Sequence, residues 1–159
     1  MAMPGSLKLD AFLPYRLSIA SNLVSDAIAS TYRALFGLRI PEWRLIAIIA
    51  ESEGMTQQAL GVATRMDKVA VSRAALALAA RGLVERRPNP EDQRSHLLSL
   101  TASGRALYEQ VAPKALEMEA RIFAGFDAAE LARFAAMLDR LEAAAGAFEA
   151  VAEDASRAP

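Results

Sequence analysis

The stretch from residue 67 to residue 101, DKVAVSRAALALAARGLVERRPNPEDQRSHLLSLT, decides the fold of this chain. Its first half places apolar residues at helical spacing and ends at Gly82, a residue typical of helix C-termini. Two short apolar runs, 83–84 and 97–100, then flank a charged segment. This segment contains Pro88 and Pro90, which cannot donate to a strand ladder and are expected in a loop. The stretch therefore predicts a helix followed at once by a projecting β-hairpin.

The sequence on either side of this stretch predicts five more helices. Three precede it, over 14–36, 41–54 and 56–66, and the last of them is capped by Thr56. Two follow it: one starts at Thr101 and should be kinked by Pro113, and the other opens at Asp127 with a capping box. The expected fold is mainly α with a small β-hairpin wing. Its expected parts are an arm and dimerisation helix at 1–36, a winged helix-turn-helix module at 37–100, and dimerisation helices with a tail at 101–159.

Asp67 is expected to cap the helix that follows it, and this helix has two faces of different character. Its expected core face is Val71, Ala74, Ala75 and Leu78. The opposite face carries Lys68, Val69, Ser72 and Arg73, which should point outward together. Arg and Lys can pair with guanine edges, Ser can bond several edges, and Val can contact a thymine methyl. Two short helices with a tight turn, the second one basic at its start, are typical of a DNA-binding helix-turn-helix.

The charge of the chain is concentrated although its net charge is only −1. Residues 56–105 hold eight Lys or Arg against four Asp or Glu, a balance of +4, and the remainder holds ten against fifteen, a balance of −5. A basic module between acidic flanks is the electrostatic pattern of a nucleic-acid binder, although charge alone fits a solvated surface equally well. The hydrophobic fraction of 53% is ample for a core.

Several classes of function lack the residues they need. The chain has no cysteine and one histidine, His96, so we expect neither a disulfide framework nor a metal site. It has no Gly-rich phosphate loop and no nucleophile elbow, and we expect no cofactor and no enzymatic activity. No apolar run is long enough for a membrane span, and residues 1–10 do not resemble a signal peptide, so the expected compartment is the cytoplasm.

The hairpin supplies further candidate DNA contacts. Arg94 is expected at its tip, because an arginine suits the narrow, electronegative minor groove. Asp92 should hold a guanidinium in place through an ion pair, or else serve as an ordinary turn-stabilising residue. Arg86 and Arg87 alternate along a strand and should not both face DNA. Arg65, Thr56 and Gln57, at the helix turn and at a helix N-terminus, are candidates for phosphate contacts.

Residues 55–107 resemble the MarR family of winged helix-turn-helix transcription regulators. The segments that carry the resemblance are GLVERR at 82–87, DQR at 92–94 and LSLTASG at 98–104. The usual wing pattern is Asp-Arg-Arg, so Gln93 replaces one arginine here. The resemblance implies a homodimer that binds double-stranded DNA at a pseudo-palindromic operator. The apolar stripes at 107–126 and 131–148 support a dimer, although these helices could also pack only on each other within one chain.

The same resemblance implies DNA binding that a small, aromatic or anionic effector relieves. The candidate ligand-binding residues are Tyr15, Tyr32, Phe36, Arg39, Trp43 and Arg44, which we expect at the junction of the first two helices. Phe36 and Trp43 fit a plain core role equally well. The sequence thus favours a ligand-responsive regulator, most simply a repressor, and the alternative is a winged-helix adaptor that binds proteins without binding DNA.

Overall fold

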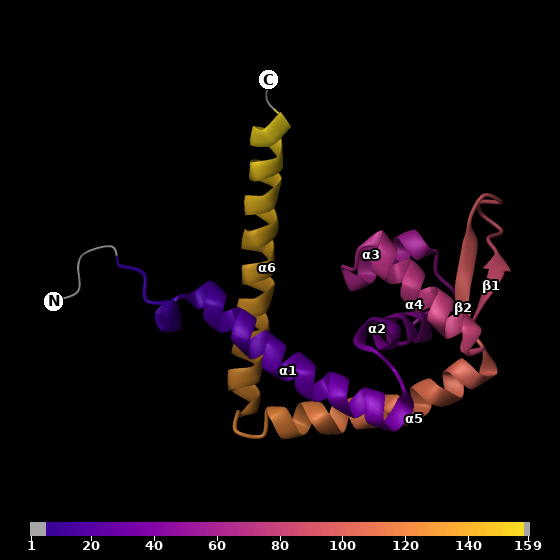
Figure 1. Cartoon of the computed structure of the whole chain (residues 1–159), viewed down its shortest axis with the longest axis horizontal. Coiled ribbons are helices and arrows are strands. Elements are labelled where there is room, and N and C mark those ends of the chain that lie inside the picture. Colours follow the sequence, from indigo (N-terminus) through magenta and orange to yellow (C-terminus); the bar gives the residue numbers. More distant parts are fainter. Residues whose placement is uncertain (1–5, 158–159) are drawn as a thin grey trace. The chain divides into compact units, whose positions relative to one another are not determined.

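The computed structural model describes residues 6–157, with the exception of the side chains of residues 154, 155 and 157. Figure 1 shows a mainly helical chain with one antiparallel β-hairpin, which confirms the predicted fold class. The elements are a 3-10 turn at Leu9–Ala11, α1 at Leu13–Phe36, α2 at Ile40–Ala50, α3 at Gln57–Thr64, α4 at Lys68–Ala80, β1 at Val84–Pro88, β2 at His96–Leu100, α5 at Ala102–Ile122 and α6 at Ala128–Arg157.

The chain divides into two compact units, Met1–Met118 and Glu119–Pro159. This division follows packing, so the functional division at residues 36 and 100 stays a prediction. The first unit contains the main core, which is built from α2, α3, α4, the hairpin and α5 around one late turn of α1. The largest fully buried side chains are Leu38, Leu45, Ile46, Ile49, Leu60, Val71, Leu78, Leu98 and Val111. In α2, the buried apolar side chains are Leu45, Ile46 and Ile49.

Local capping fixes where several helices begin, as the sequence predicts. The Thr56 hydroxyl accepts the Ala59 backbone N–H at 3.1 Å, and the Asp67 carboxylate accepts that of Ala70 at 2.7 Å. Asp127 and Glu130 form the expected reciprocal capping box at the start of α6, with both bonds at 2.8 Å. Each cap satisfies backbone donors that the first helical turn leaves without a partner.

The expectation that α2 continues to Gly54 is wrong, because the chain after Ala50 joins the sheet. The backbone groups of Met55 and Leu98 exchange two hydrogen bonds, at 3.0 and 2.7 Å, and the Ser99 hydroxyl donates to the Glu53 carbonyl at 2.8 Å. A Cβ atom on Gly54 would lie 2.9 Å from Ser99 Oγ. The segment before α3 therefore forms an isolated β-bridge, Met55 with Leu98, that anchors the hairpin to the helices.

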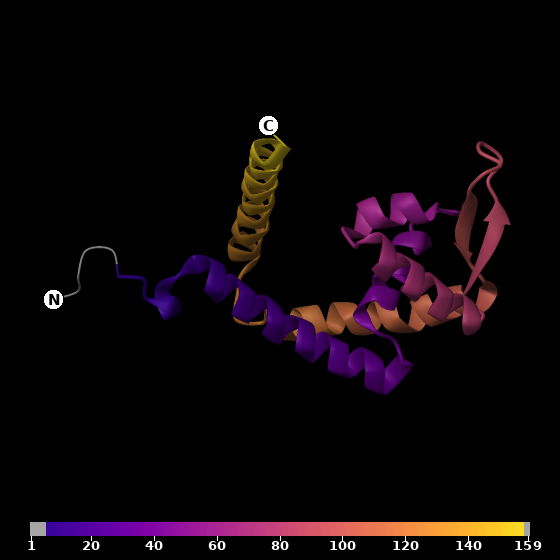
Figure 2. The same cartoon turned by 45° about the horizontal axis from the view of Figure 1, so that its top comes forward.

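The hairpin is also longer than the sequence predicted. Val84 pairs with Leu100 at its base, and Pro88 pairs with His96 at its far end. Pro88 therefore closes β1 instead of lying in the loop, a position at the end of a strand where its missing donor costs little. Figure 1 and Figure 2 both show the hairpin projecting beside α3 and α4. This is the geometry of a wing.

The second unit is centred on α6. In the connection before it, the ring of Phe123 lies 6.0 Å from that of Phe126 and 6.3 Å from that of Phe134. Several large apolar side chains of this helix are solvent-exposed in the single chain, among them Met137, Leu141, Phe148 and Val151. The helix therefore has an apolar surface that one copy of this unit leaves uncovered.

Candidate nucleic-acid interface

The helix-turn-helix is formed by α3 and α4, which a tight turn of three residues, 65–67, separates. Arg65 adopts a left-handed conformation with a φ of 54° and ends α3. This conformation is uncommon for a residue other than glycine, and it reverses the chain direction within a few residues. Asp67 then caps α4. The turn and the cap together set the direction in which the N-terminal end of α4 leaves the module.

The two faces of α4 are sorted as its sequence predicts. Val71, Ala74, Ala75 and Leu78 are buried. Lys68, Val69 and Arg73 are exposed, and Ser72 is half-buried beside them. The predicted contact residues of α4 therefore share one accessible ridge. Leu76 extends this ridge, with 61% of its surface exposed, and sequence reasoning missed it. The sequence did contain a signal for this residue, because a spacing of seven residues places Leu76 on the same side of the helix as Val69.

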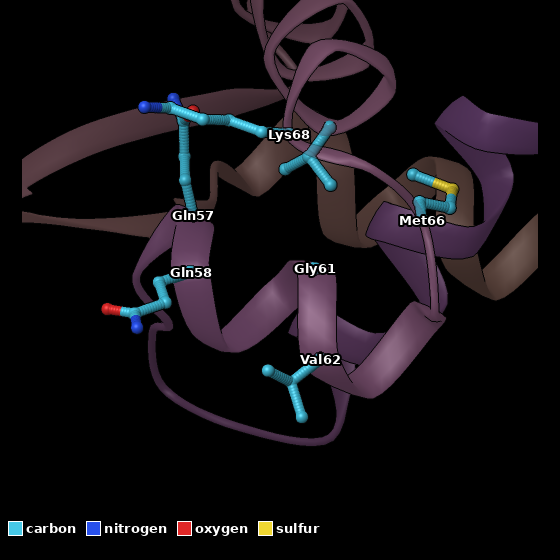
Figure 3. A pocket seen from close by; sticks show the side chains of 7 residues that line it. Gln57, Gln58, Gly61, Val62, Met66 and Lys68 are labelled. Carbon is cyan, nitrogen blue, oxygen red and sulfur yellow. The ribbon is translucent and has the colours of Figure 1, made fainter. Parts of the chain in front are cut away.

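A hollow of about 610 Å³ lies between α3 and α4 and includes the start of α4 in its lining. Figure 3 shows Lys68 and Gln57 extending toward the same side of this hollow, while Gln58 and Val62 project from the other side of α3. Gly61 lies on its wall, where a Cβ atom would lie 3.4 Å from the Met66 carbonyl oxygen and 3.8 Å from Val71 Cγ2. Side chains with hydrogen-bonding ends and apolar Val62 thus line one concave surface.

A second hollow, of about 540 Å³, separates the helix-turn-helix from the wing. Three cations from three different segments line it: Lys68 from α4, Arg86 from β1, and Arg94 from the hairpin loop. The remaining lining residues are Thr56, Gln57, Gln58, Asn89, Asp92, Ser95, His96 and Leu98. Since three lysine or arginine side chains face one carboxylate, this groove attracts anions. The N-terminal end of α3, with its positive dipole, opens into the same groove.

The structure separates the two arginines of β1, as strand alternation predicts. Arg86 lines the groove, whereas the Arg87 guanidinium bonds to the Glu85 carboxylate at 2.6 and 3.0 Å. Residues 85 and 87 share one face of the strand, and Arg86 therefore lies on the other. The structure does not bring Arg87 into the groove with the other candidates.

The role of Asp92 differs from the ion pair that we expected. Its carboxylate accepts the backbone N–H of Arg94 at 2.9 Å, and its carbonyl accepts both the backbone N–H and the hydroxyl of Ser95, at 3.1 and 3.2 Å. Asn89 completes the loop by donating to the Ser95 hydroxyl at 2.8 Å. Asp92 thus fixes the backbone of the wing tip. Its carboxylate bonds to the backbone of Arg94 and not to the guanidinium, which is therefore available to other partners. The turn-stabilising alternative is the one that the geometry supports.

The candidate ligand residues are only partly brought together. Trp43 contacts Tyr32 edge-on, with ring centroids 5.5 Å apart, and stacks on Tyr108 at 5.9 Å. Phe36 packs against the adjoining core. Sequence reasoning missed Tyr108, because it lies 65 residues from Trp43 along the chain and nothing local links them. Burial raises the pKa of the Tyr32 hydroxyl by desolvation.

The other three candidates have different positions. The Arg39 guanidinium bonds to the buried Glu42 carboxylate at 3.0 Å, and the backbone N–H of Arg39 donates to the same group at 3.0 Å, so this pair caps α2. Arg44 is exposed on α2. Tyr15 lies in the first turn of α1, 17 residues before Tyr32, or about 26 Å along a helix. The expectation that Tyr15 joins the other aromatic residues at this junction is therefore wrong within one chain.

Two kinds of functional feature, a membrane-spanning helix and a metal-binding cluster, are absent from the described residues. Within residues 6–157, no helix has the length and apolar character needed to cross a bilayer. The same part of the chain contains no cluster of three or more His, Asp or Glu side chains that could hold a metal ion.

A helix-turn-helix with an adjoining β-hairpin wing and a cationic groove between them defines a winged helix-turn-helix protein. The MarR family model matches residues 36–95, the span from the end of α1 to the wing. No curated protein matches the chain. The solved structures that are similar to it include a MarR/EmrR family regulator from Acinetobacter sp. ADP1, which is 25% identical and has a TM-score of 0.80. That likeness covers 88% of this chain and 99% of the Acinetobacter protein.

Two further solved structures share the fold. A MarR family regulator from Silicibacter pomeroyi is 29% identical with a TM-score of 0.70, and the match covers 84% of this chain and 90% of that one. CouR from Rhodococcus jostii RHA1, solved with p-coumaroyl-CoA bound, is 23% identical with a TM-score of 0.76 over 86% of this chain and 95% of CouR. The chain therefore has the MarR winged module and the fold of the MarR family transcriptional regulators.

Proposed function

We propose that the chain is a sequence-specific DNA-binding transcription regulator that acts in the cytoplasm as a homodimer on a pseudo-palindromic operator. The observation that carries this proposal is the meeting of three features on one side of the module. These are the accessible ridge of α4, the cationic groove lined by Lys68, Arg86 and Arg94, and the wing tip that Asp92 holds in shape. Together they match a major-groove helix with flanking backbone contacts.

The ridge and the groove have different tasks in this proposal. Val69, Ser72 and Arg73, with Lys68, read base edges from α4, whereas Arg94 enters the neighbouring minor groove from the wing. Arg86 and the start of α3, with Thr56 and Gln57, face the phosphate backbone, and Arg65 does so from the turn. Arg87 contributes long-range charge only, because it is paired with Glu85 on the other face of β1.

The proposal of a homodimer is supported by apolar surface that a single chain leaves exposed. Along α1 the exposed side chains include Leu13, Leu17, Ile19, Leu23 and Leu35. On α6, considered by itself, Phe134, Met137, Leu141 and Phe148 are exposed. Apolar surface on this scale is unusual for a monomeric soluble protein and marks an association surface. A two-fold dimer places two copies of α4 on one side at the spacing of successive major grooves, about 34–36 Å.

The test is DNA binding measured by fluorescence anisotropy as a function of salt, on the region upstream of the gene and on fragments selected from a random library. We expect nanomolar to micromolar binding that weakens steeply as salt rises, because bound cations on DNA are released. Arg94→Ala should weaken binding to all sequences and reduce the salt slope by about 1. Arg73→Ala should also relax sequence preference. Arg87→Ala is the matched control from the same hairpin, and it should change affinity less than Arg94→Ala.

Three results would contradict the proposal. Wild-type protein that binds none of the DNA fragments at low salt would favour the adaptor function instead. Equal loss on all sequences for Arg73→Ala would remove the base-reading role from the ridge. A monomer in sedimentation at micromolar concentration would remove the two-fold symmetry on which operator recognition depends.

We further propose that a small aromatic or anionic effector binds beside Trp43 and weakens DNA binding, so that the protein is a repressor relieved by ligand. The support is the aromatic junction of Tyr32, Trp43 and Tyr108, together with the exposed Arg44 on the same helix. Trp43 is the only tryptophan in the chain, so its emission reports directly on this junction. Titration with aromatic carboxylates and their thioesters should quench or shift this emission at the concentrations that release DNA. Release of DNA without a change in emission would place the effector elsewhere.

A further inference from the structure

The C-terminal end of α1 is bonded to the C-terminal end of α4 by one side chain. Arg81, the residue that directly follows α4, donates from Nη1 to the Gly37 carbonyl at 3.1 Å and from Nη2 to the Phe36 carbonyl at 3.0 Å. These two carbonyls lie at the end of α1, where the helix has no further N–H groups to offer them. The guanidinium is a fixed fork of donors, and it also complements the negative end of the helix dipole.

The rest of α1 has few other attachments to the winged module. Tyr32 is its one buried residue among those described, and Ile28 and Phe36 are its partly buried residues that pack on the core. All of these lie in the last three turns of the helix. Gly37 then ends α1 in the left-handed conformation, with a φ of 61°. The direction of α1 relative to α4 is therefore set near a single point, at which Arg81 provides a bidentate tie between the two helices.

We propose that Arg81 is a positioning residue that fixes the angle between α1 and the recognition helix α4, and so sets the separation of the two recognition helices in the homodimer. This inference rests on the proposed function. Its physical basis is leverage. With 24 residues, α1 is about 36 Å long, so a rotation of about 10° at its C-terminal end moves the far end by roughly 6 Å. One base pair occupies about 3.4 Å of the duplex, so this movement corresponds to nearly two base pairs.

The first experiment measures the separation directly and does not use DNA. The chain contains no cysteine, so L76C on the exposed ridge of α4 gives one nitroxide label per protomer. Pulsed dipolar spectroscopy on the full-length homodimer then yields the distance between the two copies of α4. We expect one narrow distribution for L76C alone. Adding Arg81→Gln should broaden or shift this distribution by several ångströms, and Arg81→Lys, which keeps the charge but not the fork, should give an intermediate result.

The matched control is Arg33→Gln. Arg33 lies in the last turn of α1, so its removal takes one positive charge from the same helix terminus. It is not the residue that bonds α1 to α4, and the distance distribution should therefore stay as in L76C alone. Thermal unfolding of both variants, recorded in parallel, separates loss of positioning from loss of stability. A role of Arg81 in stability alone would lower the melting temperature and leave the distances unchanged, which would overturn the proposal.

The second experiment reads the same property through DNA. From a selected operator, a series is made in which one or two base pairs are inserted or deleted between the half-sites. Wild-type protein should bind one spacing at least tenfold more tightly than its neighbours, and Arg81→Gln should reduce this ratio to threefold or less. Base preference within each half-site should be unchanged. An unchanged ratio would overturn the positioning role. A different outcome would remove the proposed function alone. In that case the wild-type protein binds no DNA, but the distance between the two α4 helices is well defined and still changes with Arg81→Gln.

Discussion

Substitution of Gly104 by alanine is the sharpest test of how α5 is attached to the wing. A Cβ atom at this position would lie 1.9 Å from the Leu83 carbonyl oxygen, 2.9 Å from the Leu83 carbonyl carbon and 3.3 Å from Leu100 Cδ2. Real Cβ atoms essentially never approach another atom closer than 3.0 Å, so the backbone must separate by at least 1.1 Å. The Leu83 carbonyl also accepts the Thr101 backbone N–H at 3.1 Å, a bond that this separation would break or lengthen.

The magnitude follows from three contributions. Overpacking against backbone costs about 1–3 kcal/mol, and the lost hydrogen bond about 0.5–1.5 kcal/mol. The higher helix propensity of alanine offsets up to about 1 kcal/mol of this cost. With the full offset, we therefore expect Gly104→Ala to lower the free energy of unfolding by about 0.5–3.5 kcal/mol.

The measurement is urea unfolding followed by far-ultraviolet circular dichroism at one fixed protein concentration, because association contributes to the apparent stability of a dimer. Gly125→Ala is the control, because a Cβ atom there meets nothing within 4 Å and the change should stay within about 0.5 kcal/mol. If Gly104→Ala proved as stable as wild type, the close approach of α5 to the Leu83 carbonyl would be refuted.

Three other predictions follow from single contacts. Because burial raises the pKa of Tyr32 above its ordinary value, its stabilising effect is complete below about pH 10 and is lost as pH rises from there toward the folded-state pKa. Tyr32→Phe should therefore reduce the alkaline loss of stability, as measured by the difference in urea midpoint between pH 8 and pH 10.5; an equal loss in both proteins would contradict the burial. Asp67→Ala removes the N-cap of α4 and should cost about 1 kcal/mol in the same unfolding assay, whereas full stability would mean that the cap is dispensable. Asp92→Ala should loosen the wing backbone and weaken DNA binding although it removes a negative charge, and tighter binding would show that the charge of Asp92 outweighs its hydrogen bonds.

The parts of the fold that the sequence predicted are those specified by neighbouring residues. Thr56 and Asp67 were assigned as caps because a cap needs only a side chain and the backbone three residues later. The buried face of α4 followed from helical spacing alone. The errors arose where distant segments meet. Gly54 was assigned to a helix end, but Ser99 and Leu98, more than 40 residues later, draw that segment into the sheet.

In the candidate interface, too, the sequence predicted the part formed by neighbouring residues and missed the part formed by distant segments. The ridge of α4 could be read from one helix, and its accessibility agrees with the structure. The groove could not, because Lys68, Arg86 and Arg94 come from three segments that only the folded hairpin brings together. Tyr108 in the aromatic junction was missed for the same reason. Tyr15 was placed there wrongly, since the helix that contains it extends away from the residues it was grouped with.

The acids of the wing show why net charge is a poor guide to this interface. Both charged groups in the pair of Glu85 and Arg87 lie on the strand face away from the groove, so they nearly cancel there. Asp92 does lie at the groove, but its carboxylate is occupied by the Arg94 backbone and orders the loop that presents the Arg94 side chain. A count of charges over residues 56–105 treats all of these groups as equal. The folded hairpin instead directs two of its three arginines into the groove and uses its acids for local structure, and this arrangement lets a chain with a net charge of −1 present a cationic surface.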